Sequence, residues 1–244
     1  MTGDYRPETY GDRWAPIYDD IHGHLDPTPA VERLLPMARG GRVLELGIGT
    51  GRIALPLAAH GLEVHGVDAS EAMVARLRGK PGGDAIPVTI GDFAGVPVEG
   101  EFNLVFVAFN TFFCLLTQED QVRCFRNVAD HLAPEGVFVI EAFVPDPTRW
   151  TRGQRVGATR VDDRHVSLEA STHDPAMQRT TSQQIVIDED GVHLFPVQIR
   201  YAYPSELDLM AQVAGLRLMS RSGDWSGGPF TAASTAHVSV YGRL

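Results

Sequence analysis

Acidic side chains stand at the ends of three apolar stretches in the first half of the chain: Glu45, Asp68 and Asp92. Each stretch has the composition of a short strand buried in a sheet. Because open α/β sheets bind ligands beyond the carboxyl ends of their strands, we expect the three carboxylates to surround one ligand site. The carboxylate of Glu45 would repel a pyrophosphate, whereas it would attract a cationic or amine-bearing ligand.

A glycine-rich turn follows the first of these stretches. Three glycines occupy alternate positions: Gly47, Gly49 and Gly51. Glycines let the backbone turn sharply and let a ligand approach it without meeting a Cβ atom. A dinucleotide fingerprint needs glycines at the first, third and sixth places, but the sixth place here is Arg52. The spacing therefore disfavours an NAD(P)-dependent oxidoreductase, and the three strand-end acids disfavour a turn that binds nothing.

The stretch E-L-G-I-G-T-G-R, residues 45–52, resembles motif I of the class I S-adenosylmethionine (SAM) methyltransferases, which has the pattern E-x-G-x-G-x-G. SAM carries a sulfonium and an α-ammonium group, so its charge agrees with the acid before the turn. Asp68 lies about twenty residues beyond the glycines, where a second strand places a ribose-binding carboxylate. The resemblance implies that Asp92 and Phe93 hold the adenine. It also implies SAM as cofactor and S-adenosyl-L-homocysteine as product.

The expected cofactor site combines the strand ends, the turns after them and aromatic residues near the N-terminus. Ser70 is expected to cap the helix that follows the second strand, residues 64–68. The fourth strand is expected at residues 102–109, and the turn after it, residues 110–113, faces the sulfur end of SAM in the family. The predicted contacts are Tyr10, Trp14, Tyr18, Glu45, Gly47, Gly49, Gly51, Asp68, Ala69, Met73, Asp92, Phe93, Phe109 and Asn110.

Tyr10, Trp14 and Tyr18 recur at four-residue spacing, which on one helix places them on one face. The stripe is either packing against the core or part of a lid over a ligand. Buried Tyr hydroxyl and Trp N–H groups need partners, and a ligand can supply them. The segment also resembles the N-terminal cap of small-molecule methyltransferases. We therefore favour a helical lid over residues 1–38, in which residues 1–7 are loose.

The acceptor determines which catalytic groups are needed. An amine must be neutral to attack, whereas a hydroxyl needs a base that takes its proton. The candidate bases are Tyr18, His22 and His165, with Glu141 as a further acid. A single His is more often structural, and Glu141 can instead accept a hydrogen bond from a strand-end amide. The pair His22 and His24 offers only two possible metal ligands, so no metal site is expected.

The order of elements predicts a doubly wound α/β fold, with a seven-stranded, mostly parallel sheet. Residues 155–203 are rich in Val, Ile and Thr and contain turn signals, which predicts an inserted antiparallel β-sheet of four strands. A helix capped by Ser205 and two closing strands follow. We expect a SAM-binding domain at residues 39–145 and 204–244 and the inserted sheet at 146–203. This architecture resembles bacterial small-molecule enzymes that include sugar N-methyltransferases.

Composition limits the partners. The 244 residues carry a net charge of -10, which leaves no basic excess for general nucleic-acid binding. No apolar run approaches the roughly twenty residues that span a bilayer, and no secretory segment is visible at the N-terminus. The two cysteines, Cys114 and Cys124, are expected to be reduced. We expect a cytoplasmic protein that acts on a small molecule and that can form a homodimer through the inserted sheet.

The sequence thus predicts a SAM-dependent methyltransferase that moves a methyl group to a small acceptor by in-line displacement. An amine acceptor is slightly preferred to a hydroxyl. The alternative is a SAM-binding or regulatory module without transfer activity. An open cavity beside the sulfonium, lined by the N-terminal segment and the inserted sheet, would indicate an enzyme, whereas a pocket filled by side chains would indicate a module.

Overall fold

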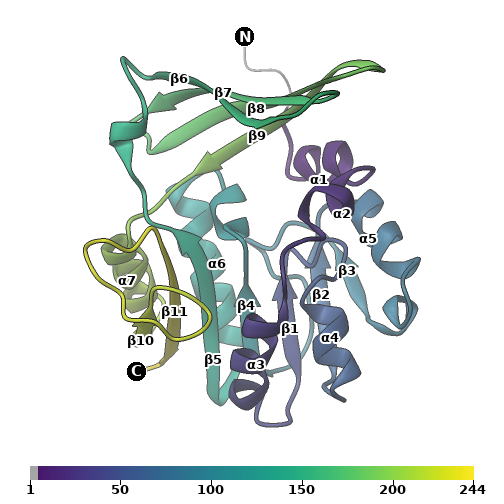
Figure 1. Cartoon of the computed structure of the whole chain (residues 1–244). Coiled ribbons are helices and arrows are strands. Elements are labelled where there is room, and N and C mark those ends of the chain that lie inside the picture. The colour runs from purple at the N-terminus through teal and green to yellow at the C-terminus, as the bar shows by residue number, and fades with distance from the viewer. Residues whose placement is uncertain (1–4) are drawn as a thin grey trace.

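The computed structural model describes residues 5–244 and contains two β-sheets (Figure 1). The larger sheet has seven strands in the order β10-β11-β5-β4-β1-β2-β3. Its strands are β1 (Val43–Leu46), β2 (Val64–Asp68), β3 (Val88–Ile90), β4 (Phe102–Val107), β5 (Leu132–Phe143), β10 (Leu216–Ser222) and β11 (Ala236–Arg243). Strands β1 to β5 pair in parallel, and β11 joins β5 and β10 antiparallel. The predicted doubly wound, mostly parallel sheet is confirmed.

Helices cover both faces of this sheet. Along β4, Val105 and Val107 contribute to one apolar layer, while Leu104 and Phe106 contribute to the other, because successive strand residues point to opposite faces. The first layer includes residues of α6 (Gln118–His131) and α7 (Pro204–Val213). The second includes residues of α3 (Thr28–Ala38), α4 (Ala54–Ala59) and α5 (Glu71–Arg78). The strand ends are therefore held between two packed layers.

Four antiparallel strands form the inserted sheet, in the order β6-β7-β8-β9 (Figure 1). They are β6 (Gln154–Val161), β7 (Val166–Asp174), β8 (Arg179–Asp188) and β9 (Gly191–Arg200). The inserted antiparallel sheet is thus confirmed. On one face of β9, Phe195 and Val197 pack in an apolar cluster with Trp14 and Met73. The inserted sheet therefore rests on the N-terminal helices.

The N-terminal aromatic residues do not lie on one helix, as the spacing predicted. The structure has two short helices, α1 (Thr9–Trp14) and α2 (Tyr18–His22), so Tyr18 belongs to a different helix from Tyr10. Pro16 lies between the helices and has no backbone N–H to continue the helical hydrogen bonds. The part of the predicted lid and of the predicted loose segment at residues 1–4 lies outside the described residues.

The end of α6 and the start of α7 are two further boundaries. α6 leads directly into β5, whose pairing with β4 shifts between Leu132 and Val137. Ser205 does not cap α7, because Tyr203 is the residue before the helix and Pro204 is its first residue. Proline suits that first position, where its missing N–H is not needed. No helix in residues 5–244 is long and apolar enough to cross a membrane.

Candidate functional site

A cavity of about 240 Å³ lies where the N-terminal segment meets the carboxyl ends of β1, β2 and β3. Predicted site residues from all of these elements line it: Tyr10, Tyr18, Gly47, Gly49, Asp68, Ala69, Met73, Asp92 and Phe93. The topology explains why they meet, since β1, β2 and β3 are parallel neighbours and end at one edge. The cavity is open, and no residue of the inserted sheet lines it.

The Asp68 carboxylate fixes the glycine turn. Its Oδ2 accepts a hydrogen bond from the Gly49 N–H at 2.7 Å, and its Oδ1 accepts one from the Ser70 N–H at 2.9 Å. Burial raises the pKa of Asp68 above its ordinary value, while these two N–H groups lower it. Each carboxylate oxygen has two lone pairs, so both oxygens can still accept bonds from ligand hydroxyl groups.

The three glycines have different surroundings. Gly49 has a φ of +55°, and a Cβ atom there would meet nothing within 4 Å, so its backbone faces open space. At Gly47 a Cβ atom would lie 2.4 Å from Thr111, and at Gly51 it would lie 2.3 Å from Leu77. Gly51 thus allows close packing of the turn and lies outside the cavity, while Gly49 leaves room for a ligand.

The end of β3 supplies another acceptor and an apolar surface. Asp92 Oδ1 accepts a hydrogen bond from the Ala94 N–H at 2.9 Å, and its other oxygen forms no hydrogen bond within residues 5–244. Phe93 is buried beside it, and both residues line the cavity. A flat ring that carries an amino group would match this pair.

Glu45 is a buried acid at the end of β1. Its side chain is 5% exposed, and Oε2 has no hydrogen-bond partner among the described residues. Burial raises the pKa of Glu45 to about 8, although nearby Arg52 opposes the shift. Both side chains line a smaller hollow of about 30 Å³, which also contacts Gly47 and Phe109. A ligand that carries a positive and a negative group could pair the first with Glu45 and the second with Arg52 in this hollow.

The turn after β4 is held by two side chains. Phe109 and Asn110 both have left-handed backbones, with φ of 55° and 65°. Glu141 Oε2 accepts a hydrogen bond from the Phe109 N–H at 2.7 Å, and Asn110 Oδ1 accepts one from the Phe143 N–H at 2.6 Å. Glu141 therefore bonds a strand-end amide, the alternative to a catalytic role. Asn110 lines neither hollow, and its contact with the cofactor stays a prediction.

Trp14 does not line the cavity. Its side chain is 5% exposed, and its ring centroid is 5.6 Å from that of Tyr10 and 5.1 Å from that of Phe195. It packs the two N-terminal helices against β9, so the structure places it in the support of the site.

Two of the three candidate bases lie near the smaller hollow. His22 and Tyr18 have ring centroids 4.7 Å apart, and both line a third hollow of about 330 Å³ with Arg52. Burial raises the pKa of Tyr18 to about 12, which keeps its phenol protonated at neutral pH. Burial also lowers the pKa of His22, which keeps its imidazole neutral. Of the two, only His22 can accept a proton at neutral pH.

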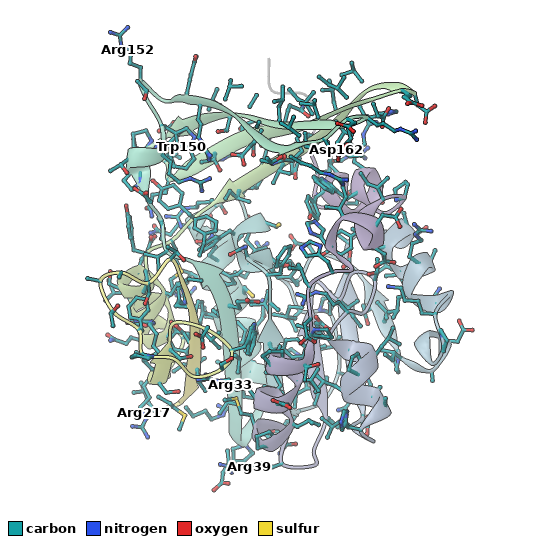
Figure 2. All side chains as sticks on the ribbon, viewed as in Figure 1. Arg33, Arg39, Trp150, Arg152, Asp162 and Arg217 are labelled. Atoms are coloured by element: carbon teal, nitrogen blue, oxygen red, sulfur yellow. The ribbon has the colours of Figure 1, made fainter. Side chains whose placement is uncertain are left out.

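His165 is not brought to these hollows. It lies in the turn between β6 and β7, where its Nδ1 is 3.9 Å from Asp162 Oδ2. Figure 2 shows Asp162 on the inserted sheet. Within residues 5–244 no group of three or more His, Cys, Asp or Glu side chains could hold a metal ion.

The sequence reasoning missed several cavity residues. The N-terminal part is Tyr5, Arg6, Pro7 and Gly11, and the part after β4 is Thr111, Cys114, Leu115, Leu116 and Asp120. Residues 5–7 were expected to be loose, but the Tyr5 hydroxyl accepts a hydrogen bond from the Gln198 N–H of β9 at 3.2 Å. The aromatic side chain of Tyr5 was the available signal. Arg52 is a cation seven residues after Glu45 in the sequence. The sequence analysis took it only as evidence that the turn does not bind a dinucleotide.

Comparisons with known proteins agree with this geometry. A family model described as a methyltransferase domain matches residues 43–136. Cypemycin N-terminal methyltransferase from a Streptomyces species is 30% identical over 242 residues, which cover 97% of this chain and 98% of that protein. The chain belongs to the class I SAM-dependent methyltransferases.

Two further similarities extend over most of this methyltransferase. The solved structure of the CcbJ methyltransferase from Streptomyces caelestis is 43% identical, with a TM-score of 0.93 and coverage of 98% of this chain and 100% of that one. A dTDP-4-amino-2,3,4,6-tetradeoxy-D-glucose N,N-dimethyltransferase from Saccharopolyspora spinosa is 28% identical over 198 residues, which cover 76% of this chain and 77% of that protein. The resemblance to bacterial sugar N-methyltransferases is therefore confirmed.

The residues of this methyltransferase fit SAM. The open backbone at Gly49 leaves space for the cofactor, and Asp68 beside it has spare acceptor capacity. The buried oxygen of Glu45 that has no partner would be satisfied by a cationic group. Arg52, which lines the same hollow, offers the complementary charge for a carboxylate.

The contact between α1 and α5 gives a first prediction for cofactor binding. A Cβ atom at Gly11 would lie 2.4 Å from Ser70 Cβ, and Asp12 Oδ1 accepts the Ser70 hydroxyl hydrogen at 2.7 Å. The substitution Gly11→Ala should displace α1 from the cavity at a cost of about 1–3 kcal/mol, typical of overpacking. Titration calorimetry should show at least about fivefold weaker S-adenosylhomocysteine binding.

A glycine outside the contact provides the control. At Gly79, the residue after α5, a Cβ atom would meet nothing closer than 3.5 Å. The substitution Gly79→Ala should leave the affinity unchanged. Equal affinities for the Gly11→Ala variant and the wild type would mean that α1 does not cover the cofactor.

Proposed function

We propose that this protein transfers the methyl group of SAM to an amine of a small-molecule acceptor. The observation that carries the proposal is the open cavity in which Asp68, Asp92 and the glycine turn meet. This cavity would hold the nucleoside part of the cofactor, which a module without transfer activity also needs. Similarity to a named methyltransferase over nearly the whole chain favours the enzyme over the module. The inserted sheet was expected to line the cavity, but none of its residues does so. The sheet instead supports the N-terminal segment, which lines the cavity.

Each part of the cofactor has a proposed partner. Asp68 accepts hydrogen bonds from the ribose hydroxyls, while Asp92 and Phe93 hold the adenine. Glu45 binds the α-ammonium group, and Arg52 binds the carboxylate. This assignment is supported by the order of the residues along the two hollows, since Gly47 and Gly49 line both.

When bound, SAM supplies a methyl group activated by a positively charged sulfur. The protein then has to align the acceptor with the sulfur–methyl bond and exclude water, and such alignment reaches effective molarities of about 10⁵ M or more. Tyr18 lines both the small hollow and the neighbouring hollow of about 330 Å³, which His22 also lines, and the acceptor would bind on that side of Tyr18. Transfer to a neutral amine would leave an ammonium group on the acceptor, and His22, whose imidazole is neutral, or water would take its proton.

Several observations support an amine rather than a hydroxyl. A hydroxyl acceptor needs a base during attack. The Tyr18 phenol is protonated and Glu141 is engaged with the Phe109 amide, which leaves His22 as the remaining candidate base. A neutral amine attacks without a base. The cypemycin enzyme is named for an N-terminus and the dTDP-sugar enzyme for N,N-dimethylation, and both names agree with an amine acceptor. We also propose the division into a lid at residues 1–38, a SAM-binding domain at 39–145 and 204–244 and a sheet at 146–203 through which two copies pair. Of the described lid residues, those of α1 and α2 border the hollows, whereas α3 packs on the large sheet.

Matched acceptors test this proposal. One pair is a dTDP-sugar with an amino or a hydroxyl group at carbon 4, and another is a short peptide with a free or an acetylated N-terminus. We expect S-adenosylhomocysteine release and a product with one added methyl group only from an amine member, at least about tenfold faster than from its partner. Faster transfer to the hydroxyl member of a pair would contradict the proposal.

A further inference from the structure

Tyr18 lies where three hollows of the site meet. It lines the cofactor cavity, the small hollow with Glu45 and the hollow of about 330 Å³ with His22, which we call the acceptor hollow. Tyr18 and His22 are the first and last residues of α2, so the position of this helix shapes the acceptor hollow. α2 has five residues and none of them is buried. A helix this short is not stable by itself, so other elements have to hold it in place.

Asp19 joins α2 to the glycine turn. Its Oδ1 accepts a hydrogen bond from the Thr50 hydroxyl at 2.7 Å and another from Lys80 Nζ at 2.9 Å. Lys80 Nζ also donates to the Thr50 carbonyl oxygen at 2.8 Å. Thr50 is 1% exposed and stands between Gly49 and Gly51. We call the three contacts among Asp19, Thr50 and Lys80 the α2 latch.

The α2 latch is an ion pair that contributes little to the stability of the whole protein. Burial acts to raise the pKa of Asp19, but hydrogen bonds from Thr50 and Lys80 outweigh burial and lower it, so the carboxylate is charged at neutral pH. Lys80 is the only lysine in the sequence, and two of the three N–H groups of its ammonium are used in the latch. The side chains of Asp19 and Lys80 are 36% and 31% exposed, and ion pairs exposed to this extent add little global stability. Loss of the latch should therefore release α2 without unfolding the protein.

The preceding helix, α1, has attachments of its own. Asp12 accepts the Ser70 hydroxyl hydrogen at 2.7 Å. Arg76 of α5 donates to the carbonyl oxygens of Ala15 and Pro16, at 3.0 and 2.6 Å. None of these contacts uses a latch residue. Because α1 borders the cofactor cavity, the cofactor should keep its affinity when the latch is broken.

We propose that the α2 latch transmits the state of the glycine turn to α2, so that Tyr18 and His22 take their final positions at the acceptor hollow when the cofactor binds. The inference rests on the proposed function in placing the acceptor in that hollow. A cofactor that fixes the glycine turn also fixes Thr50 within it. The latch passes this restraint to Asp19, which directly follows Tyr18. The three latch residues are thus positioning residues, and the acceptor meets an ordered hollow after the cofactor has bound.

Hydrogen–deuterium exchange tests the latch without an acceptor. In the wild type, S-adenosylhomocysteine should slow exchange of the amides of residues 17–23 at least about fivefold. In Lys80→Met, which removes the ammonium group but keeps a long side chain, this slowing should be lost, although S-adenosylhomocysteine should bind within about twofold of the wild-type affinity. A residue that only stabilised the fold would change exchange equally with and without the ligand.

Two further variants sharpen this test. Arg160→Met is the matched control, because Arg160 forms a similarly exposed ion pair with Asp162, at 2.8 Å, on the inserted sheet. It should keep the wild-type slowing. Asp19 and Lys80 line the acceptor hollow themselves, whereas Thr50 does not. Thr50→Val, which removes the hydroxyl that bonds Asp19, should therefore weaken the slowing through the latch alone.

Turnover measures the consequence for the acceptor. With the amine that the matched acceptors identify, Lys80→Met should lower kcat/KM for the acceptor about tenfold, because the acceptor loses its alignment. The KM for SAM should stay at the wild-type value. Thr50→Val should lower kcat/KM for the acceptor in the same direction, and Arg160→Met should leave it unchanged.

The results that would overturn the inference are distinct from a failure of the proposed function. Exchange of residues 17–23 that does not respond to S-adenosylhomocysteine in the wild type, or that responds equally in Lys80→Met, shows that the latch transmits nothing. Loss of the response in Arg160→Met, or a fall in S-adenosylhomocysteine affinity in Lys80→Met as large as the fall in kcat/KM, also overturns the inference. Absence of methyl transfer to either amine contradicts the proposed function, and the exchange result then decides on the latch alone.

Discussion

The substitution Asp68→Ala is expected to weaken SAM binding by about 1–3 kcal/mol, or roughly 5- to 150-fold. Two losses add up in this variant. The ribose hydroxyls lose a buried, charged acceptor, and the N–H groups of Gly49 and Ser70 lose the carboxylate that they bond at 2.7 and 2.9 Å. The glycine turn therefore loses its fixed shape together with its ligand contact. Titration calorimetry with SAM measures the affinity.

Two variants separate these losses. Asp68→Asn retains one oxygen acceptor, so its affinity should fall between those of the wild type and the alanine variant. Asp162→Ala removes a carboxylate in the turn between β6 and β7, outside the cavity, and should bind SAM as the wild type does. Unchanged affinity in Asp68→Ala would remove this residue from the cofactor site.

The second large effect is a pH dependence of SAM binding that disappears in Glu45→Gln. The pKa of Glu45 is about 8 because its carboxyl is buried, so the group is mostly neutral at pH 6 to 7. The ammonium group of SAM favours the carboxylate form and must displace that proton. Affinity should therefore rise close to tenfold from pH 6 to pH 7. Calorimetry at pH 6.5 in two buffers of different ionisation enthalpy should report release of about one proton.

The glutamine variant cannot release this proton, so its affinity should be weaker at pH 7 and nearly constant over the same range. Equal pH slopes in the two proteins would show that Glu45 does not supply the charge. The stability of the free protein gives an independent check, because it should fall as the pH rises while the affinity for SAM increases. The folded-state pKa lies above the ordinary value of 4.5, so the stabilising effect of the protonated form is complete below about pH 4.5 and is lost as the pH rises through 8.

Local patterns predicted the elements that carry the site. The strand end at Asp68 and the N-cap at Ser70 are encoded by neighbouring residues, and the structure confirms both. Parallel strand order then brings Glu45, Asp68 and Asp92 to one edge of the sheet. This step follows from the general topology of doubly wound folds, which is why it could be made without a structure.

Contacts distant in sequence could not be predicted in the same way. Tyr5 reaches the cavity because its hydroxyl meets the Gln198 N–H, 193 residues away. The pairing of β6 with β7 shifts between Ala158 and Arg160, so alternation within β6 alone does not show which of its residues share a face of the inserted sheet. The break between α1 and α2 could have been predicted from the sequence, because Pro16 lies between the two helices. The prediction of one helix gave the aromatic spacing more weight than this proline.

A crystal structure of the protein with S-adenosylhomocysteine tests the central claim most directly. We expect the two ribose hydroxyls within hydrogen-bond distance of the Asp68 carboxylate, the adenine amine at Asp92 and the amino-acid end between Glu45 and Arg52. A nucleoside bound away from Asp68 and Asp92, with the backbone at Gly49 untouched, would contradict the account.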